Sequence, residues 1–242
     1  MPTPDFTLAS QYIQHIGDQI AAKGVAVPLW LQQSGLPGNW LEEPTPGISL
    51  PVLERLVGEA ISMTREPAIG LLVGERLLVN THGMLGYAAM SSVTIRQMLE
   101  LFEHFIRLRI ALITARHEVH ADEVRLRFTE VLPLGDIRRP VLECVLLAVK
   151  NVLDFITMGT CRISYIAFPF ERPDYAVLAE GLFKCEVRYG QSWAGFSMPP
   201  EQLDTPLKMA DPAAFQEAAL ICRRELDKLS ANESLSARVQ RV

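Results

Sequence analysis

The sequence has few of the features that would place a protein in a membrane or outside the cell. Of its 242 residues four are cysteines, scattered without a CxxC pair: Cys144, Cys161, Cys185 and Cys222. Such spacing is typical of reduced, mostly buried thiols and lacks the clustered ligands of a zinc site. There is no basic segment followed by an apolar core at the N-terminus, and no apolar run reaches the ~18 residues of a membrane span. We therefore expect a soluble, cytoplasmic protein with no membrane partner.

Positive charge and catalytic motifs are also scarce. Lysine and arginine total 23 against 28 for aspartate and glutamate, which leaves a net charge of -5 and no long basic run. Because basic side chains facing phosphates supply most of the affinity for nucleic acids, the chain by itself is a poor candidate for DNA binding. It contains no GxSxG, GxGxxG or P-loop motif. We therefore predict that it is not an enzyme.

One short segment resembles a metal motif. His117 and His120 lie close together beside Glu118, as in the HExxH motif. That motif, however, needs its histidines four residues apart on a helix, so that both reach one metal. Here they are three apart in a predicted hairpin, where odd spacing places them on opposite faces. We interpret both as solvated hairpin residues and predict no metal or other cofactor.

Apolar residues are abundant, at 49% of the chain, enough for one large domain or two small ones. In the first half they recur at helical spacing between stop signals. Examples are the stretch 12–20, followed by Gly24, and the stretch 53–61, followed by Pro67. These patterns predict an all-helical N-terminal subdomain over residues 1–80.

The second half mixes helices and strands. Thr94 and Gln97 have the spacing of a capping box, which predicts a helix start. Strict alternation over residues 124–129 predicts a strand with one wet face, paired with residues 112–116. Further strands are predicted over 163–168, 185–189 and 193–198, and helices over 138–158, 173–182 and 212–229. This mixture predicts that residues 81–229 form an α+β subdomain with a mixed, mostly antiparallel sheet and long helices.

The longest predicted helix, residues 138–158, has a wide apolar face, which places it at the centre of the subdomain. Glu143 lies beside this face and could be a buried acid. On the helical wheel it shares a side with Lys150, which favours a solvated position instead. Asn151 and Asp154 complete that predicted polar side.

Five side chains are candidates for binding a small molecule. Arg107 and Arg109 could hold a carboxylate or a phosphate, because a guanidinium pairs with either in a fork geometry. Exposure or a structural ion pair is the alternative for both. Tyr165, Tyr189 and Trp193 lie on predicted strands and could line a ligand pocket or simply pack in the core.

Several short motifs occur in an order that resembles one protein family. They are Gly83-Met84-Leu85-Gly86-Tyr87-Ala88, Ser91-Ser92-Val93-Thr94-Ile95, Gly159-Thr160, Phe168-Pro169-Phe170, Pro173-Asp174-Tyr175, Leu203-Asp204-Thr205-Pro206-Leu207 and Ala210-Asp211-Pro212. Together they resemble AraC-type transcription regulators with an arabinose-binding-like N-terminal domain, over roughly residues 8 to 229. The chain departs from the family pattern at Phe183-Lys184-Cys185, where Phe-Gly is usual.

The resemblance implies a domain that binds a small effector, dimerises, or both, and thereby controls helix-turn-helix domains on DNA. Residues 230–242 are predicted to be a linker and the first part of the DNA-binding domain, since Leu235–Val239 resembles its first helix. The rest of that domain is missing, so we interpret the chain as a fragment that meets DNA only through the missing part. We predict that Phe215, Ala219 and Cys222, one stripe of the last helix, contribute to a homodimer interface.

An amino acid or another metabolite fits the resemblance as the effector. Two alternatives stay open. The domain could be an assembly module with no small-molecule ligand, or, less in keeping with the missing motifs, a small α+β enzyme.

Overall fold

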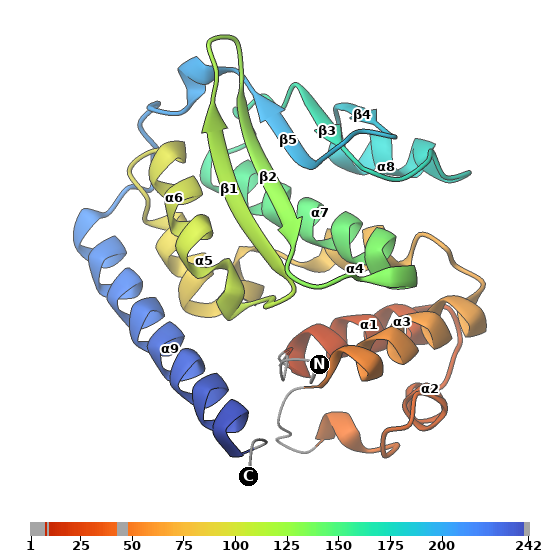
Figure 1. Cartoon of the computed structure of the whole chain (residues 1–242). Helices are drawn as coiled ribbons and strands as arrows, with labels where there is room; N and C mark the ends of the chain where they lie inside the picture. Colours follow the sequence, from red (N-terminus) through yellow and green to blue (C-terminus); the bar gives the residue numbers. More distant parts are fainter. Residues whose placement is uncertain (1–7, 9, 43–47, 240–242) are drawn as a thin grey trace.

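The structure is a computed structural model that describes residues 8, 10–42 and 48–239. It is the predicted α+β fold, with helices packed on a mixed sheet of five strands. Figure 1 shows the sheet at one side of the molecule, the long helix α7 against it, then α4, and then α1 and α3 at the opposite side. One continuous apolar core includes residues from both predicted subdomains.

The N-terminal residues form helices, as predicted. These are α1 (Ser10–Ala22), α2 (Val27–Gln33), α3 (Leu50–Thr64) and α4 (Ile69–Arg76). Gly24 ends α1 with a positive φ of 82°, which glycine adopts without strain. Trp30 of α2 is fully buried, and its Nε1 donates to the carbonyl oxygen of Leu56 in α3 at 2.9 Å. That bond satisfies the polar atom of the indole and fastens α2 to α3.

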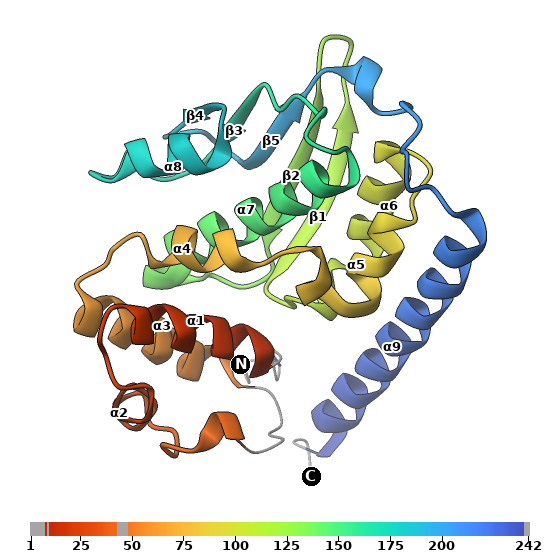
Figure 2. The ribbon, with the colours of Figure 1, turned by 180° about the vertical axis from the view of Figure 1, so that it is seen from behind.

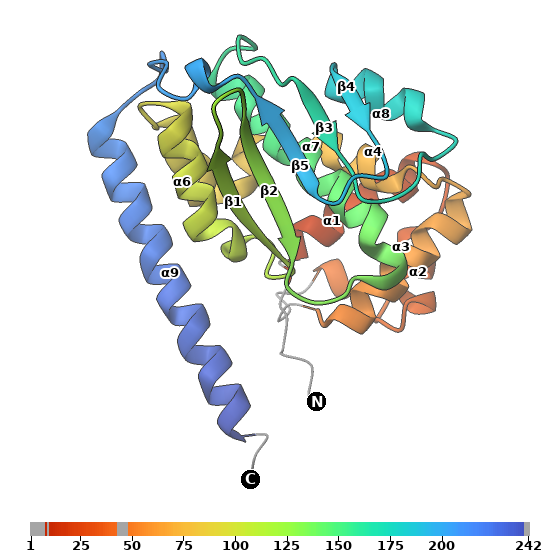
Figure 3. The same ribbon diagram turned by 45° about the horizontal axis from the view of Figure 1, so that its top comes forward.

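The strands are β1 (Ile113–Val119), β2 (Val124–Glu130), β3 (Tyr165–Ala167), β4 (Glu186–Arg188) and β5 (Ala194–Met198), arranged in the order β1-β2-β5-β3-β4. The predicted hairpin is confirmed, with His117 opposite Leu126. All pairings are antiparallel except β3 with β4. Figure 3 shows that one face of the sheet is free of helices, while α7 lies behind the other.

Helix α7 (Arg138–Ile156) is central, as predicted, but its predicted polar side is not solvated. Glu143 and Lys150 are both buried. Glu143 accepts a hydrogen bond from Tyr175 Oη at 2.9 Å, and Lys150 pairs with Asp154. Partners of this kind allow charged groups to be buried. A helical wheel shows which residues share a side of a helix, and it does not show whether a further layer covers that side.

Helices α4 and α7 pack unusually closely, and Figure 2 shows α4 between α7 and the pair α1 and α3. A Cβ atom on Gly70 would lie 2.3 Å from the carbonyl oxygen of Pro140, and one on Gly74 would lie 2.9 Å from that of Cys144. Only glycine at both positions permits this approach of the two backbones. The Asn151 side chain then donates to the Gly74 carbonyl oxygen at 3.0 Å, close to the end of α4.

The remaining helices are α5 (Gly83–Met90), α6 (Ile95–Phe105), α8 (Ala176–Phe183) and α9 (Pro212–Val239), with 3-10 turns at Val79–His82 and Ile106–Leu108. Helix α5 was not predicted from periodicity. The predicted cap is present, because Gln97 N donates to Thr94 Oγ1 at 3.2 Å. The Gln97 side chain accepts from Val93 N at 2.7 Å, one residue earlier than in a capping box. Residues 230–239, from the segment predicted as linker and start of the DNA-binding domain, belong to α9.

The four cysteines are free thiols. Over the residues that the structure describes, none of the helices combines the length and the apolar character needed to cross a lipid bilayer.

Candidate functional site

A cavity of about 130 Å³ lies where the helical half meets α7. Its walls come from α1, α3, α4, α5, α6 and α7 and from the turns between them. The lining residues are Leu8, Tyr12, Ile16, Leu53, Val57, Ala60, Ile69, Gly70, Val73, Leu77, His82, Leu85, Phe102, Ile106, Arg109, Ile110, Pro140, Val141, Cys144, Val145, Ala148, Val149 and Val152. These side chains are overwhelmingly aliphatic, so the interior favours an apolar guest.

Polar side chains meet at one part of this cavity. Tyr12 Oη and His82 Nδ1 are 3.2 Å apart, and Arg109 supplies the nearby charge. Burial raises the pKa of Tyr12 to about 12. Burial, and then the neighbouring Arg109 cation, lower the pKa of His82 to about 4. At neutral pH both side chains are therefore uncharged, and they offer hydrogen bonds rather than charge.

Arg109 is the charged residue among the described cavity walls. Its side chain is 18% exposed, and its Nη2 lies 4.0 Å from Glu225 Oε2 of α9. The Nε atom is buried without a hydrogen-bond partner in the described part of the chain. Arg109 thus lies between the cavity and α9.

Gly83 makes room for this guanidinium. A Cβ atom at position 83 would lie 3.0 Å from Arg109 Nη2, and the backbone there has a positive φ of 54°. Gly86, one turn later, lets α5 approach the Val79 carbonyl oxygen, which a Cβ atom would meet at 1.9 Å. The two glycines of the Gly83–Ala88 motif therefore have a structural reason, since they bring α5 and Arg109 to the cavity.

The two arginine candidates separate in the structure. Arg109 lines the cavity, whereas Arg107 is exposed and is not among the lining residues. Both lie at the same helix end, two residues apart, where the helix is already a 3-10 turn. The sequence places both at that end but does not show which one points inwards.

The three aromatic candidates lie outside the cavity. Tyr165 and Trp193 meet edge to face with ring centroids 6.1 Å apart. The guanidinium of Arg188 lies 3.7 Å from the centre of the Tyr165 ring. Glu123 accepts hydrogen bonds from Tyr165 Oη at 3.0 Å and from Arg125 Nε at 2.6 Å. We use the name outer cluster for a group with residues of β2, β3, β4 and β5, namely Glu123, Arg125, Tyr165, Arg188, Trp193 and Ser197.

Tyr189 packs between phenylalanine rings instead. Its ring is stacked against Phe168 at 5.9 Å and lies 6.0 Å from Phe170. Its Oη is buried without a hydrogen-bond partner in the described residues. Because a hydroxyl is neutral, leaving it unpaired costs less than leaving a guanidinium nitrogen unpaired.

The predicted dimer stripe faces the chain itself. Cys222 is fully buried, and Phe215 and Ala219 are half-buried against the core. Helix α9 packs here on α5, with smaller contacts to α6. This stripe therefore holds α9 on its own domain.

His117 and His120 have protein partners. His117 is half-buried, not solvated as predicted, and its Nδ1 lies 2.7 Å from Glu103 Oε1 of α6. His120 Nε2 lies 3.6 Å from Glu118 Oε2. In the described chain, His, Cys, Asp and Glu side chains form no group of three that could hold a metal.

Sequence reasoning missed Tyr12 and His82. Tyr12 is one apolar position of the predicted helical stretch 12–20, and His82 immediately precedes the Gly83 motif without any spacing of its own. The one available signal was the motif, because a close glycine indicates that something approaches the backbone.

Comparisons with known proteins agree with the motif order. The family model described as the arabinose-binding domain of AraC transcription regulator, N-term, matches residues 24–207. The ornithine utilization regulator of Pseudomonas aeruginosa is 26% identical over 231 residues, which cover 96% of this chain and 68% of that protein. The fold resembles the crystal structure of the transcriptional regulator CdpR from Pseudomonas aeruginosa, with a TM-score of 0.61 and 19% identity over 80% of this chain.

This chain spans 59% of the length of the solved regulator. The family model, by contrast, covers most of the chain and both predicted halves. The chain therefore belongs to the family of arabinose-binding N-terminal domains of AraC transcription regulators.

Proposed function

We propose that this chain is the effector-sensing domain of a transcription regulator and that the cavity between α1, α3, α4 and α7 is its effector site. The observation that carries the proposal is an apolar cavity with one polar corner, lined by residues from both halves of a family member. Such cavities, apolar with a few converging polar groups, are the usual form of small-molecule sites. A catalytic role is not proposed, because the family is one of regulators.

The proposed subdomains, residues 1–80 and 81–229, would respond to the effector as two walls of one site. An effector that binds one arrangement of these walls better than another shifts the population towards it. Helix α9 contacts α5 and the turn before Arg109, so its packing would follow that shift. In the whole regulator, which we place in the cytoplasm, α9 and residues 230–242 would lead to a helix-turn-helix domain that binds DNA.

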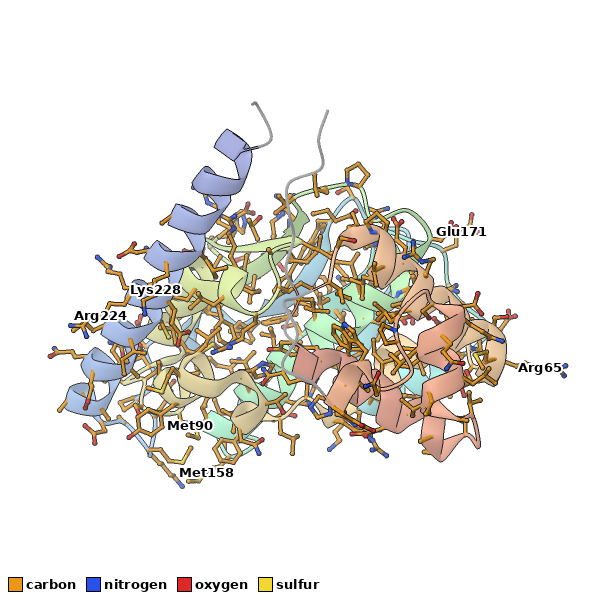
Figure 4. All side chains as sticks on the ribbon, turned by 90° about the horizontal axis from the view of Figure 1, so that it is seen from below. Arg65, Met90, Met158, Glu171, Arg224 and Lys228 are labelled. Atoms are coloured by element: carbon orange, nitrogen blue, oxygen red, sulfur yellow. The ribbon has the colours of Figure 1, made fainter. Side chains whose placement is uncertain are left out.

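We further propose a homodimer, since paired DNA half-sites suit a protein with two-fold symmetry. The stripe of Phe215, Ala219 and Cys222 is used within the chain, so the outer side of α9 is the better candidate surface. Leu220 is 51% exposed there, and Figure 4 shows Arg224 on this outer side. Light scattering at micromolar concentration tests the proposal, and a monomer would contradict it.

Thermal unfolding against a panel of small molecules tests the effector site. A ligand at one hundred times its Kd should stabilise the domain by about 2.7 kcal/mol. Ala148 lines the cavity and is buried, so Ala148→Leu should fill the space and remove the stabilisation. Ala21→Leu makes the same change at an exposed position of α1 and should leave it intact. Equal stabilisation of wild type and Ala148→Leu would place the ligand elsewhere, and no shift with any ligand would favour the assembly-only module.

A further inference from the structure

An unpaired guanidinium nitrogen lies in the cavity wall. Arg109 Nε is buried and has no hydrogen-bond partner among the described residues. Its carboxylate neighbour, Glu225, is 4.0 Å from Nη2, at the limit of an ion pair, and is itself 44% exposed. Buried polar atoms are nearly always paired, and buried charges need close partners. The domain therefore carries a cation that a guest could pair far better than its own chain does.

The surroundings of Arg109 indicate an anion with a planar group. The side chains of Tyr12 and His82 are two neutral hydrogen-bonding groups near the guanidinium, whose charge acts on both. A guanidinium holds a carboxylate through two parallel hydrogen bonds. A phosphate monoester would bring nearly two negative charges to a site with one cation, which leaves charge unpaired in an apolar wall.

The rest of the cavity excludes a second charge on the guest. Among the described lining residues there is no aspartate or glutamate that could pair an ammonium group. Amino acids and polyamines would lose the hydration of their ammonium groups and gain no partner. Ornithine, suggested by the similarity to a regulator of its utilization, has two such groups.

The volume limits the size of the guest. About 130 Å³ is close to the ~150 Å³ of an engineered apolar cavity that takes up benzene. A guest that fits this space therefore has about six to eight carbons in all. The aliphatic walls from α3, α4 and α7 accept either a linear chain or a single ring.

Resting on the proposed effector site, we propose that the effector is an aliphatic or aromatic monocarboxylate of about six to eight carbons, with its carboxylate on Arg109. The hydroxyl of Tyr12 or a ring N–H of His82 donates to a carboxylate oxygen, and the hydrocarbon fills the space beside Ala148. Arg109 thereby discriminates a carboxylate from an alcohol or an amine of the same length.

Isothermal titration of the 242-residue chain with hexanoate, octanoate, benzoate, 1-hexanol, hexylamine and ornithine tests this proposal. Hexanoate should bind at least 10-fold more tightly than 1-hexanol, and hexylamine and ornithine should bind weakest. Arg109→Met should weaken hexanoate binding 10- to 100-fold, the usual loss for a charge-assisted hydrogen bond, while 1-hexanol binding is kept. Arg116→Met, the same change at an exposed position of β1, is the matched control and should change neither.

The Arg109→Met variant should fold, because methionine replaces a poorly paired cation with an apolar side chain of similar length. Its unfolding temperature without ligand should equal or exceed that of the wild type. Equal affinity for hexanoate and 1-hexanol, with both blocked by Ala148→Leu, would overturn the carboxylate inference and leave the effector site standing. Tight ornithine binding without hexanoate binding would also overturn it. Binding of none of the six compounds, with no stabilising ligand in the wider panel, would overturn both proposals.

Discussion

The outer cluster and the cavity both combine arginine with aromatic side chains, but they differ in how the arginine is paired. In the outer cluster, Arg125 and Arg188 lie over aromatic rings and each is bonded to a glutamate at 2.6–2.9 Å. In the cavity, Arg109 lies near Tyr12 and His82 with a nitrogen unpaired. The outer cluster has little left to offer a ligand, whereas the cavity has a donor without an acceptor. For this reason the candidate site is placed where an unpaired guanidinium donor and a cavity occur together, and not by residue type alone.

The largest expected effect concerns the cavity wall, which depends on a close backbone approach. Gly70→Ala should destabilise the domain by about 3 kcal/mol, because its Cβ would lie 2.3 Å from the Pro140 carbonyl oxygen and α4 must move away from α7. Chemical denaturation measures the change. Gly58→Ala in α3, whose Cβ meets nothing within 4 Å, is the control and should stabilise by up to about 1 kcal/mol. Similar effects of the two variants would show that the α4–α7 packing is looser than described.

The buried acid on the other side of α7 should give a pH signature. Burial raises the pKa of Glu143 from 4.5 to about 7. The folded state then holds a proton that the unfolded state has lost, so this group makes stability fall from pH 4.5 to 7 and level off above. The effect is on the order of 3 kcal/mol, because burial raises the pKa of Glu143 from 4.5 to about 7.

Glu143→Gln keeps a neutral side chain at every pH and should remove this fall. Because burial lowers the pKa of His82, that histidine works in the opposite sense: its contribution is lost as the pH falls from 6.5 towards 4. The variant should therefore reveal stability that rises with pH over this range. Unfolding free energies measured from pH 4 to 8 check the sign, and an unchanged profile would mean that Glu143 titrates normally.

The same substitution, arginine to methionine, should have different effects in the cavity and in the outer cluster. Arg109→Met should reduce hexanoate affinity by about 1.5–3 kcal/mol, and Arg188→Met in the outer cluster should leave it unchanged, because only the first lines the cavity. Titration calorimetry on both variants gives the answer. A loss of affinity in Arg188→Met would move the binding site to the outer face of the sheet.

The smallest effect is expected at the α9 side of Arg109. Glu225→Gln removes the carboxylate 4.0 Å from Nη2 and should strengthen hexanoate binding about threefold. The gain is small because Glu225 is partly exposed and its attraction is screened by solvent. Glu217→Gln, at an exposed position of the same helix, should change nothing. Weaker binding in Glu225→Gln would mean that Glu225 positions Arg109 for the ligand rather than competes with it.

Much of the fold follows from local patterns. The hairpin, the cap at Thr94 and the long helix α7 depend on periodicity and on neighbouring residues, which a sequence displays directly. Helix α5 was not predicted, because Gly83–Met90 has small and apolar residues on all sides and therefore no amphipathic period. The burial of Glu143 was not predicted for a related reason. The residues that cover it lie around Tyr175, 32 residues further along the chain.

The sequence likewise predicted one part of the candidate site and not the rest. Arg109 was found because a cation at a helix end is visible in the sequence. Its partners were not, because Tyr12 and His82 are 70 residues apart and meet only when α1 packs beside the turn before α5. The aromatic residues of the strands were ranked as candidates by their type, and nothing in the sequence shows that their polar atoms have partners.

By itself the sequence determined the family, the helical first half and the mixed second half, because motif order and hydrophobic period are properties of neighbouring residues. The tertiary structure alone decided where an effector could bind. A cavity is the space left by side chains from distant segments, and Gly70, Gly74 and Gly83 set its shape through contacts with backbone or side-chain atoms far away in the chain. Only in that packing does one of two neighbouring arginines become a buried cation with a free donor.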